Sequence, residues 1–172
     1  MAIAIVYDPS CDVTKEIALN IIHGIEEEDI AVTLIDCNNP DYEYLDSCKL
    51  IVFGCPTGRI LGVSENMANF MRKSEDRFEN QVWKNKLSAG FTTIGNDSSG
   101  IIEDFCRFAA KHSMLWIPQG RIEENEGSRG FTDVNLNKSY LGCISRVNDI
   151  TAMLFGKRLA KQSRLHLFPR FN

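Results

Sequence analysis

Apolar runs that alternate with helical patterns constrain this chain more than any other feature of its sequence. Five runs are predicted to be strands, at 2–7, 30–36, 48–54, 86–95 and 113–120. The run CKLIVFG (48–54) is apolar on successive residues, as is typical of a strand buried on both faces of a parallel sheet. Helical periodicity is predicted over 14–28, 64–73, 100–112 and 144–161, with Ser64 as the N-cap of the second helix. Strands that alternate with helices indicate an α/β fold with a doubly wound five-stranded parallel sheet and helices on both faces.

Length and charge limit the class of protein. The 172 residues suit one domain, predicted over 1–162, followed by a basic tail at 163–172. The net charge of −4, with no basic block before that tail, argues against nucleic acid as the main partner. No apolar stretch approaches the ~20 residues that span a bilayer. The N-terminus lacks the basic region of a signal peptide, so we expect a cytoplasmic protein.

The cysteines predict neither disulfides nor a metal site. All six lack C-x-x-C spacing, and none has a histidine at the spacing of a metal ligand. Most lie in or beside apolar runs, which favours free, buried thiols in a reducing compartment.

A ligand site is expected where strands end. In open α/β sheets, ligands bind outside the carboxyl ends of the strands. Three loops rich in small and hydroxyl residues follow predicted strands there, at 8–14, 55–64 and 92–100. Loops of this composition bring backbone N–H groups close to a ligand. The chain contains no G-x-x-x-x-G-K-[ST] phosphate loop, no G-x-G-x-x-G dinucleotide fingerprint and no G-x-S-x-G hydrolase motif.

At these loops the sequence resembles a known family. The stretches WKNKLSAGFTTIG (83–95), LIVFGCPTGRILGVS (50–64), AAKHSMLWIPQG (109–120) and VNLNKSYLG (134–142) are similar to motifs of the flavodoxin-like NAD(P)H:quinone oxidoreductases. The branch in question includes the tryptophan-repressor-binding protein. The likeness covers roughly residues 2 to 155 in the right order. It implies the strand order 2-1-3-4-5, bound FMN, NADH or NADPH as electron donor, a quinone-like acceptor and a homo-dimer or tetramer.

The resemblance also implies roles for individual residues. The FMN phosphate would be held by Ser10, Cys11, Asp12, Val13 and Thr14, in the loop that starts at Pro9. The edges of the isoalloxazine ring would be lined by Pro56, Thr57, Gly58 and Arg59 on one side and by Thr93, Ile94, Gly95 and Asn96 on the other. His112 matches a family histidine near the open face of the flavin. Phe78 lies near the place where relatives put an aromatic residue over a neighbouring subunit's flavin.

Two departures from the family pattern concern the loops. The family's phosphate loop commonly reads S-x-x-G-H-T, of which only Thr14 remains here. The second loop is longer, with Arg59, Ile60 and Leu61 in place of a shorter aromatic and glycine turn. Asp12 is predicted to be the N-cap of the first helix, where its carboxylate would satisfy the N–H groups that a phosphate needs. Either Asp12 turns away and FMN binds through those N–H groups, or it caps the helix in place of the phosphate.

Other residues admit two interpretations. His112 is either a hydrogen-bond donor to a quinone or a helix C-terminal histidine favoured by the dipole. Cys11 is either a reactive thiol at a helix N-terminus or a small residue that fills the loop. Trp116, within the fifth strand, is predicted to be in the core, and Trp83 is the better candidate for the surface.

The overall function has alternatives too. A flavin-free or weakly flavin-binding relative that acts as an interaction protein is the main one, and an electron-carrier flavodoxin is another. A signalling receiver domain is set aside, because Gly54, Cys55 and Pro56 occupy the strand end where such a domain needs an aspartate.

Overall fold

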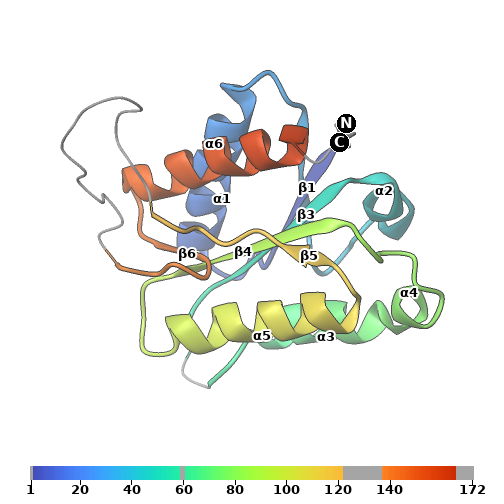
Figure 1. Cartoon of the computed structure of the whole chain (residues 1–172). Coiled ribbons are helices and arrows are strands. Elements are labelled where there is room, and N and C mark those ends of the chain that lie inside the picture. Colours follow the sequence, from blue (N-terminus) through green and yellow to red (C-terminus); the bar gives the residue numbers. More distant parts are fainter. Residues whose placement is uncertain (1, 59–60, 122–136, 166–172) are drawn as a thin grey trace.

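The chain is built around one parallel sheet (Figure 1). A computed structural model describes residues 2–58, 61–121 and 137–165. The main strands are β1 (Ile3–Tyr7), β2 (Val32–Asp36), β3 (Leu50–Cys55), β4 (Leu87–Thr93) and β5 (Leu115–Trp116). They pair in parallel in the order β2-β1-β3-β4-β5, and the predicted sheet is thereby confirmed.

The fifth position of the sheet is filled by two short strands rather than by the single strand predicted at 113–120. β5 pairs with Leu87 and Ser88, at the start of β4. A sixth strand, β6 (Cys143–Ser145), pairs in parallel with Phe91–Thr93, at the end of β4. The strand predicted at 113–120 is present but shorter: β5 ends at Trp116, although the Ile117 N–H still bonds to the Ser88 carbonyl, and β6 begins at Cys143.

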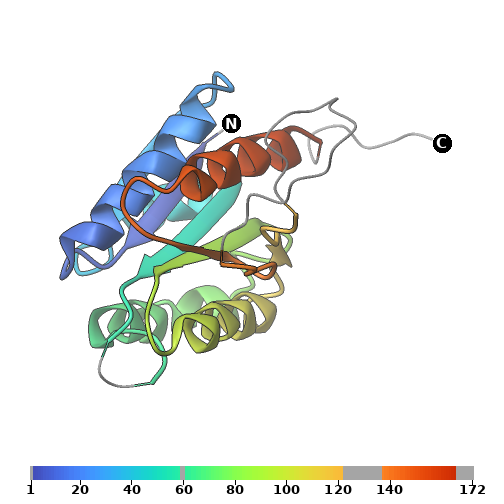
Figure 2. The ribbon, with the colours of Figure 1, turned by 90° about the vertical axis from the view of Figure 1, so that its left-hand side faces the viewer.

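Four longer helices cover the two faces of the sheet (Figures 1 and 2). One face carries α1 (Asp12–Glu26) and α6 (Ile150–Leu165), and the other carries α3 (Glu65–Lys73) and α5 (Ser98–Lys111). Successive side chains of β1 enter two different cores: Ile3 and Ile5 pack with α1 and α6, whereas Ala4 and Val6 pack toward α3 and α5. Burial on both faces explains the continuous apolar run of each central strand.

Helix boundaries differ from the predicted ones, and two short helices were missed. The first helix begins at Asp12 rather than Thr14, and the last begins at Ile150 rather than 144. The side chain of Ser64 caps α3 by accepting the N–H of Met67, so that prediction is confirmed. The missed helices, α2 (Tyr42–Ser47) and α4 (Glu75–Glu79), are too short to display a helical period.

Two glycines allow α1 and α6 to touch through their backbones. A Cβ on Gly24 would lie 1.9 Å from the carbonyl oxygen of Met153, and one on Gly156 would lie 2.1 Å from that of Ile21. Any larger residue at either position would therefore push the two helices apart.

The end of α6 reaches into the segment predicted as a tail. Ser163 is fully buried, and the Arg164 guanidinium pairs with Glu28 at 3.2 Å. The rest of the predicted tail, 166–172, lies outside the described residues. Within the described ranges, no helix is long and apolar enough to cross a membrane.

Candidate functional site

Several loops meet at the carboxyl edge of the sheet, as the parallel topology requires (Figures 1 and 2). The loop after β1 is joined to β3 by the bond from the Asp8 N–H to the Gly54 carbonyl, 2.9 Å long. The loop after β4 is joined to β6 by the bond from the Ile94 N–H to the Ser145 carbonyl, 3.1 Å long. The structure therefore brings the three predicted loops to one edge and adds a fourth, after β6, that the sequence did not reveal.

Asp8 holds the first loop in place from inside the protein. Its side chain is fully buried, and Oδ1 accepts the Ser10 N–H at 2.9 Å and the Asn66 amide at 3.0 Å. Burial alone would raise the pKa of Asp8, but hydrogen bonds from Asn66, Ser64 and Ser10 outweigh it and lower the pKa. Asp8 is thus an ionised anchor that ties the loop after β1 to the start of α3.

The first turn of α1 has no side-chain cap. Cys11, half-buried, is the N-cap residue, with φ −138° and ψ 122°, and its side chain makes no capping hydrogen bond. Asp12 is exposed and lies inside the helix, so the prediction that it is the N-cap was wrong. The N-cap is Cys11 rather than Asp12 because the helix begins at Asp12, two residues before the start that its apolar period indicates. Ser10 is exposed and Val13 half-buried beside this turn.

Thr14 carries an unusual hydroxyl in the same turn. The residue is fully buried, and its Oγ1 has no hydrogen-bond partner among the described residues. A buried hydroxyl without a partner costs free energy, so such groups call for an explanation. The first turn of α6 also holds a buried, unpartnered threonine hydroxyl, that of Thr151, but there the Asp149 carboxylate caps the helix by accepting the Thr151 N–H at 2.9 Å.

The loops after β3 and β4 contact each other through threonines. Thr93 Oγ1 accepts the N–H of Thr57 at 2.9 Å and lies 2.9 Å from the Thr57 hydroxyl. Ser98 Oγ accepts the Gly95 N–H at 2.8 Å and lies 2.9 Å from both the Thr93 and the Gly95 carbonyl oxygens, either of which can take its single proton. The Thr57–Thr93 bonds hold the two loops side by side, and the Ser98 bonds fix the shape of the loop after β4.

The remaining predicted residues of these loops differ in exposure. Pro56 is half-buried, whereas Gly58, Gly95 and Asn96 are exposed. Ile94 is 43% and Leu61 81% exposed, which leaves two aliphatic side chains on the outside of these loops. Arg59 lies outside the described residues. Sequence reasoning missed Asn66, Asp97 and Ser98, although Asp97 and Ser98 precede a helix and carry the residue types of N-caps.

The structure does not bring His112 to these loops. α5 begins beside the carboxyl edge and runs for 14 residues, about 20 Å, before His112 ends it. The imidazole is 3% exposed, and its ring centroid lies 4.9 Å from that of Trp83 and 4.6 Å from that of Phe108. Burial, aided by the Lys111 ammonium, lowers the pKa of His112 to about 4. A neutral ring enclosed at the far edge cannot donate to a substrate at the loops of the same chain.

Phe78 belongs to the same cluster as His112. Its ring lies 5.9 Å from the imidazole and is 36% exposed. Within one chain it is therefore also remote from the three loops, and a contact with a flavin would require a second subunit.

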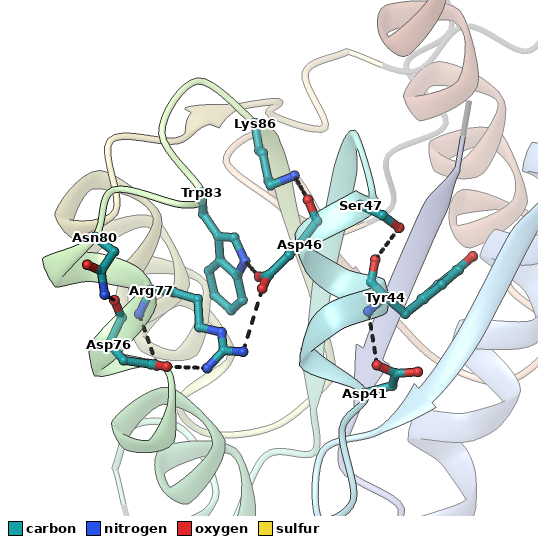
Figure 3. A network of polar contacts seen from close by, with 9 residues as sticks. All are labelled: Asp41, Tyr44, Asp46, Ser47, Asp76, Arg77, Asn80, Trp83 and Lys86. Carbon is teal, nitrogen blue, oxygen red and sulfur yellow. Dashed lines mark hydrogen bonds and ion pairs between the residues drawn. The ribbon is translucent and has the colours of Figure 1, made fainter.

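The burial of the two tryptophans differs from the prediction. Trp83 is fully buried and donates its indole N–H to Asp46 Oδ1 at 2.7 Å (Figure 3). Asp46 also faces Arg77 at 3.5 Å, and the Lys86 ammonium donates to the Asp46 carbonyl at 2.6 Å. Trp116 is only half-buried, because β5 is an edge strand. The predicted surface position of Trp83 was wrong, whereas Trp116 packs against the core, as predicted, but is only partly buried.

All six cysteines are free thiols, four of them buried. Among the described residues, no group of histidine, cysteine and acidic side chains is placed to hold a metal ion.

The strand order, with helices on both faces, is the flavodoxin-like fold, to which β6 is an addition. The chain is similar to a WrbA-like flavodoxin from Agrobacterium tumefaciens, with a TM-score of 0.73 and 23% identity over 96% of this chain and 98% of the other. It is similar to a flavodoxin from the domain Archaea, with a TM-score of 0.70 and 17% identity over 95% and 99%.

A third similar structure is the Fusobacterium nucleatum flavodoxin bound to flavin mononucleotide, with a TM-score of 0.66 and 13% identity over 96% of this chain and 98% of the other. At these identities the likeness establishes the fold alone. By sequence, no protein-family model and no curated protein matches the chain.

Proposed function

We propose that the chain binds FMN at the carboxyl edge of its sheet and passes electrons from NADH or NADPH to quinones or similar small acceptors. The observation that carries the proposal is the Thr14 hydroxyl, which is buried without a partner in an uncapped helical turn. An anion at a helix N-terminus is stabilised by the free N–H groups and by the helix dipole. A phosphate in this turn would accept the proton of the Thr14 hydroxyl and so satisfy it.

The charges nearby are compatible with a phosphate. Asp12 is an acidic residue in the first turn of α1, but it is exposed, so its charge is screened by water. Oδ1 of Asp8 already accepts bonds from Ser10 and Asn66 and holds the loop scaffold, while Oδ2 is buried without a partner among the described residues. The exposed Lys15, one residue beyond Thr14, adds a positive charge to the same turn.

The ring would lie against the loops after β3 and β4. Thr57 and Thr93 hold these loops together, and Ile94 and Leu61 offer aliphatic surface for a flat apolar ring. Bound FMN supplies the two-electron chemistry itself. The chain's own residues hold the phosphate, orient the ring and leave one side accessible. The donor, the quinone acceptor and the homo-dimer or tetramer rest on the sequence resemblance.

The second candidate is a flavin-free or weakly flavin-binding interaction protein of the same fold. The observation that favours it is the acidity of the first loop, which carries Asp8 and Asp12 and no glycine. It is the weaker candidate, because it gives no role to the unpaired hydroxyl of Thr14.

The first test is binding of FMN and of riboflavin, which lacks the phosphate, measured by calorimetry on the purified protein. We expect micromolar or tighter FMN binding and at least tenfold weaker riboflavin binding. Thr14→Val should weaken FMN binding roughly ten- to hundredfold, the value of a hydrogen bond to a charged group. It should leave riboflavin binding unchanged and should not lower the stability of the FMN-free protein, because Oγ1 bonds to nothing else in the described protein and its burial costs free energy.

Thr151→Val is the matched control. Thr151 is also fully buried with an unpartnered hydroxyl, but it lies in the first turn of α6, whose N-terminus Asp149 caps. This variant should bind FMN as the wild type does. A wild-type protein that binds no FMN at micromolar concentrations would refute the proposal and favour the second candidate. If FMN binds, NADH or NADPH oxidation with an added quinone tests the finer assignment, and size-exclusion chromatography tests the oligomer.

A further inference from the structure

Asp97 lies at the N-cap position of α5, but its side chain does not cap the helix. It is the N-cap residue of α5, where aspartate normally accepts N–H groups of its own helix. Here its side chain makes no capping bond. Oδ2 instead accepts the N–H of Gly62, a residue of the loop after β3 that lies 35 positions earlier in the chain. The carboxylate thus accepts a hydrogen bond from another loop rather than from its own helix.

The loop after β3 is shaped to make this bond. Gly62 has φ +88°, a conformation that side chains other than glycine rarely adopt. A Cβ there would also lie 2.9 Å from Oδ2 of Asp104. Glycine therefore adopts the conformation that turns this N–H toward Asp97 without backbone strain, whereas a larger residue would be strained and would also displace the Asp104 carboxylate.

A second pair of bonds fastens the beginning of the same loop. The N–H of Thr57 donates to Thr93 Oγ1, and the two hydroxyls lie 2.9 Å apart. The loop is thus held near its start by Thr93, at the end of β4, and near its end by Asp97, at the start of α5. Both fastenings belong to the segment that follows β4.

We propose that Asp97 is a positioning residue: its bond to the Gly62 N–H latches the loop after β3 to the loop after β4 before any ligand arrives. The consequence for flavin rests on the proposed function, in which the ring lies against these two loops. A loop ordered in advance does not have to lose its freedom when the ligand binds, so binding is tighter. Loss of the latch should then weaken flavin binding without any loss of direct contact.

The latch is tested first without flavin, by hydrogen exchange of the Gly62 amide in the FMN-free full chain. Asp97→Ala should raise the exchange rate roughly ten- to hundredfold, since it removes a bond to a charged acceptor. Asp97→Asn retains an acceptor oxygen and should restore most of the protection. The melting temperature should fall in Asp97→Ala only by the few degrees that the loss of one such bond costs, and by less in Asp97→Asn, because the carboxylate does not cap α5.

Asp104→Ala is the control. It removes a carboxylate that also lies against Gly62 but pairs with Arg107 at 2.9 Å and accepts nothing from the Gly62 N–H. Its Gly62 exchange should match the wild type. Equal Gly62 exchange in wild type and Asp97→Ala would overturn the latch.

Flavin binding gives the second readout. Asp97→Ala should bind FMN at least fivefold more weakly than the wild type, with rescue by Asp97→Asn. Faster exchange in Asp97→Ala combined with unchanged FMN affinity would overturn the positioning role. If the wild type binds no FMN, the proposed function fails, and the exchange experiment still decides whether the latch exists.

Discussion

Acid should destabilise this protein through His112. The imidazole is 3% exposed, and burial together with the Lys111 ammonium lowers its pKa from 6.5 to about 4. Because the folded-state pKa lies below the unfolded one, the unfolded chain takes up the proton first as the pH falls. His112 therefore costs nothing at pH 7.5, and its cost grows from about pH 6.5 down to pH 4.

The magnitude follows from the size of the shift. A difference of about 2.5 units, at roughly 1.4 kcal/mol each, gives about 3 kcal/mol when both states are fully titrated below pH 4. At pH 5 the unfolded chain is almost fully protonated and the folded one is not, which gives about 2 kcal/mol. Such a loss is a large part of the stability of a small domain.

Urea unfolding at pH 7.5 and pH 5 measures this effect, with the fluorescence of the buried Trp83 as the signal. The wild type should lose about 2 kcal/mol more than His112→Gln, whose side chain does not titrate. The carboxylates contribute equally to both proteins and cancel in the comparison. His23→Gln, which removes an exposed histidine on α1, should keep the pH dependence of the wild type. Equal losses in wild type and His112→Gln would refute the reasoning.

Three further substitutions probe the packing, the polar network and the first loop. Gly156→Ala should destabilise the fold by roughly 1–3 kcal/mol in urea unfolding, since its methyl would meet the Ile21 carbonyl at 2.1 Å; a stabilised variant would show that the helices do not touch there. Asp46→Ala leaves the buried indole N–H of Trp83 without its acceptor and should cost about 1–3 kcal/mol in the same assay, against no loss if the network is dispensable. Asp12→Asn should tighten FMN binding by only roughly two- to tenfold in calorimetry, because an exposed charge is screened; a hundredfold gain would mean that Asp12 does occupy the phosphate position.

Strands and long helices were predictable because burial leaves a pattern that local sequence displays. β1 and β3 appear within two residues of their predicted bounds, since every side chain of these strands is buried. β6 has three residues and begins inside a segment predicted to be a loop, so no period could reveal it. Asp12 shows how a shift of two residues in a helix start changes the role of a charged side chain.

The candidate site was predictable as an edge but not as a set of contacts. The rule that ligands bind at strand ends located the loops correctly, because parallel strands place all their carboxyl ends together. The family resemblance placed His112 near the flavin, whereas His112 follows a 14-residue helix that runs from the carboxyl edge back toward the opposite edge of the sheet. The bond of Asp97 to Gly62 was invisible, since the two residues are 35 positions apart and each belongs to an ordinary turn.

By itself, the sequence determined the fold class, the alternation of strands and helices and the gathering of three loops at the edge where we expect a ligand to bind. These depend on the apolar period and on small residues at strand ends, which are local properties. Only the tertiary structure decided that the first turn of α1 is uncapped and contains a buried, unpartnered Thr14 hydroxyl. It also decided that Trp83 is buried whereas Trp116 lies on an edge strand, and that Asp97 accepts a hydrogen bond from a neighbouring loop. Each of these depends on which segments pack against one another, and that choice is made by the whole chain when it buries its apolar surface.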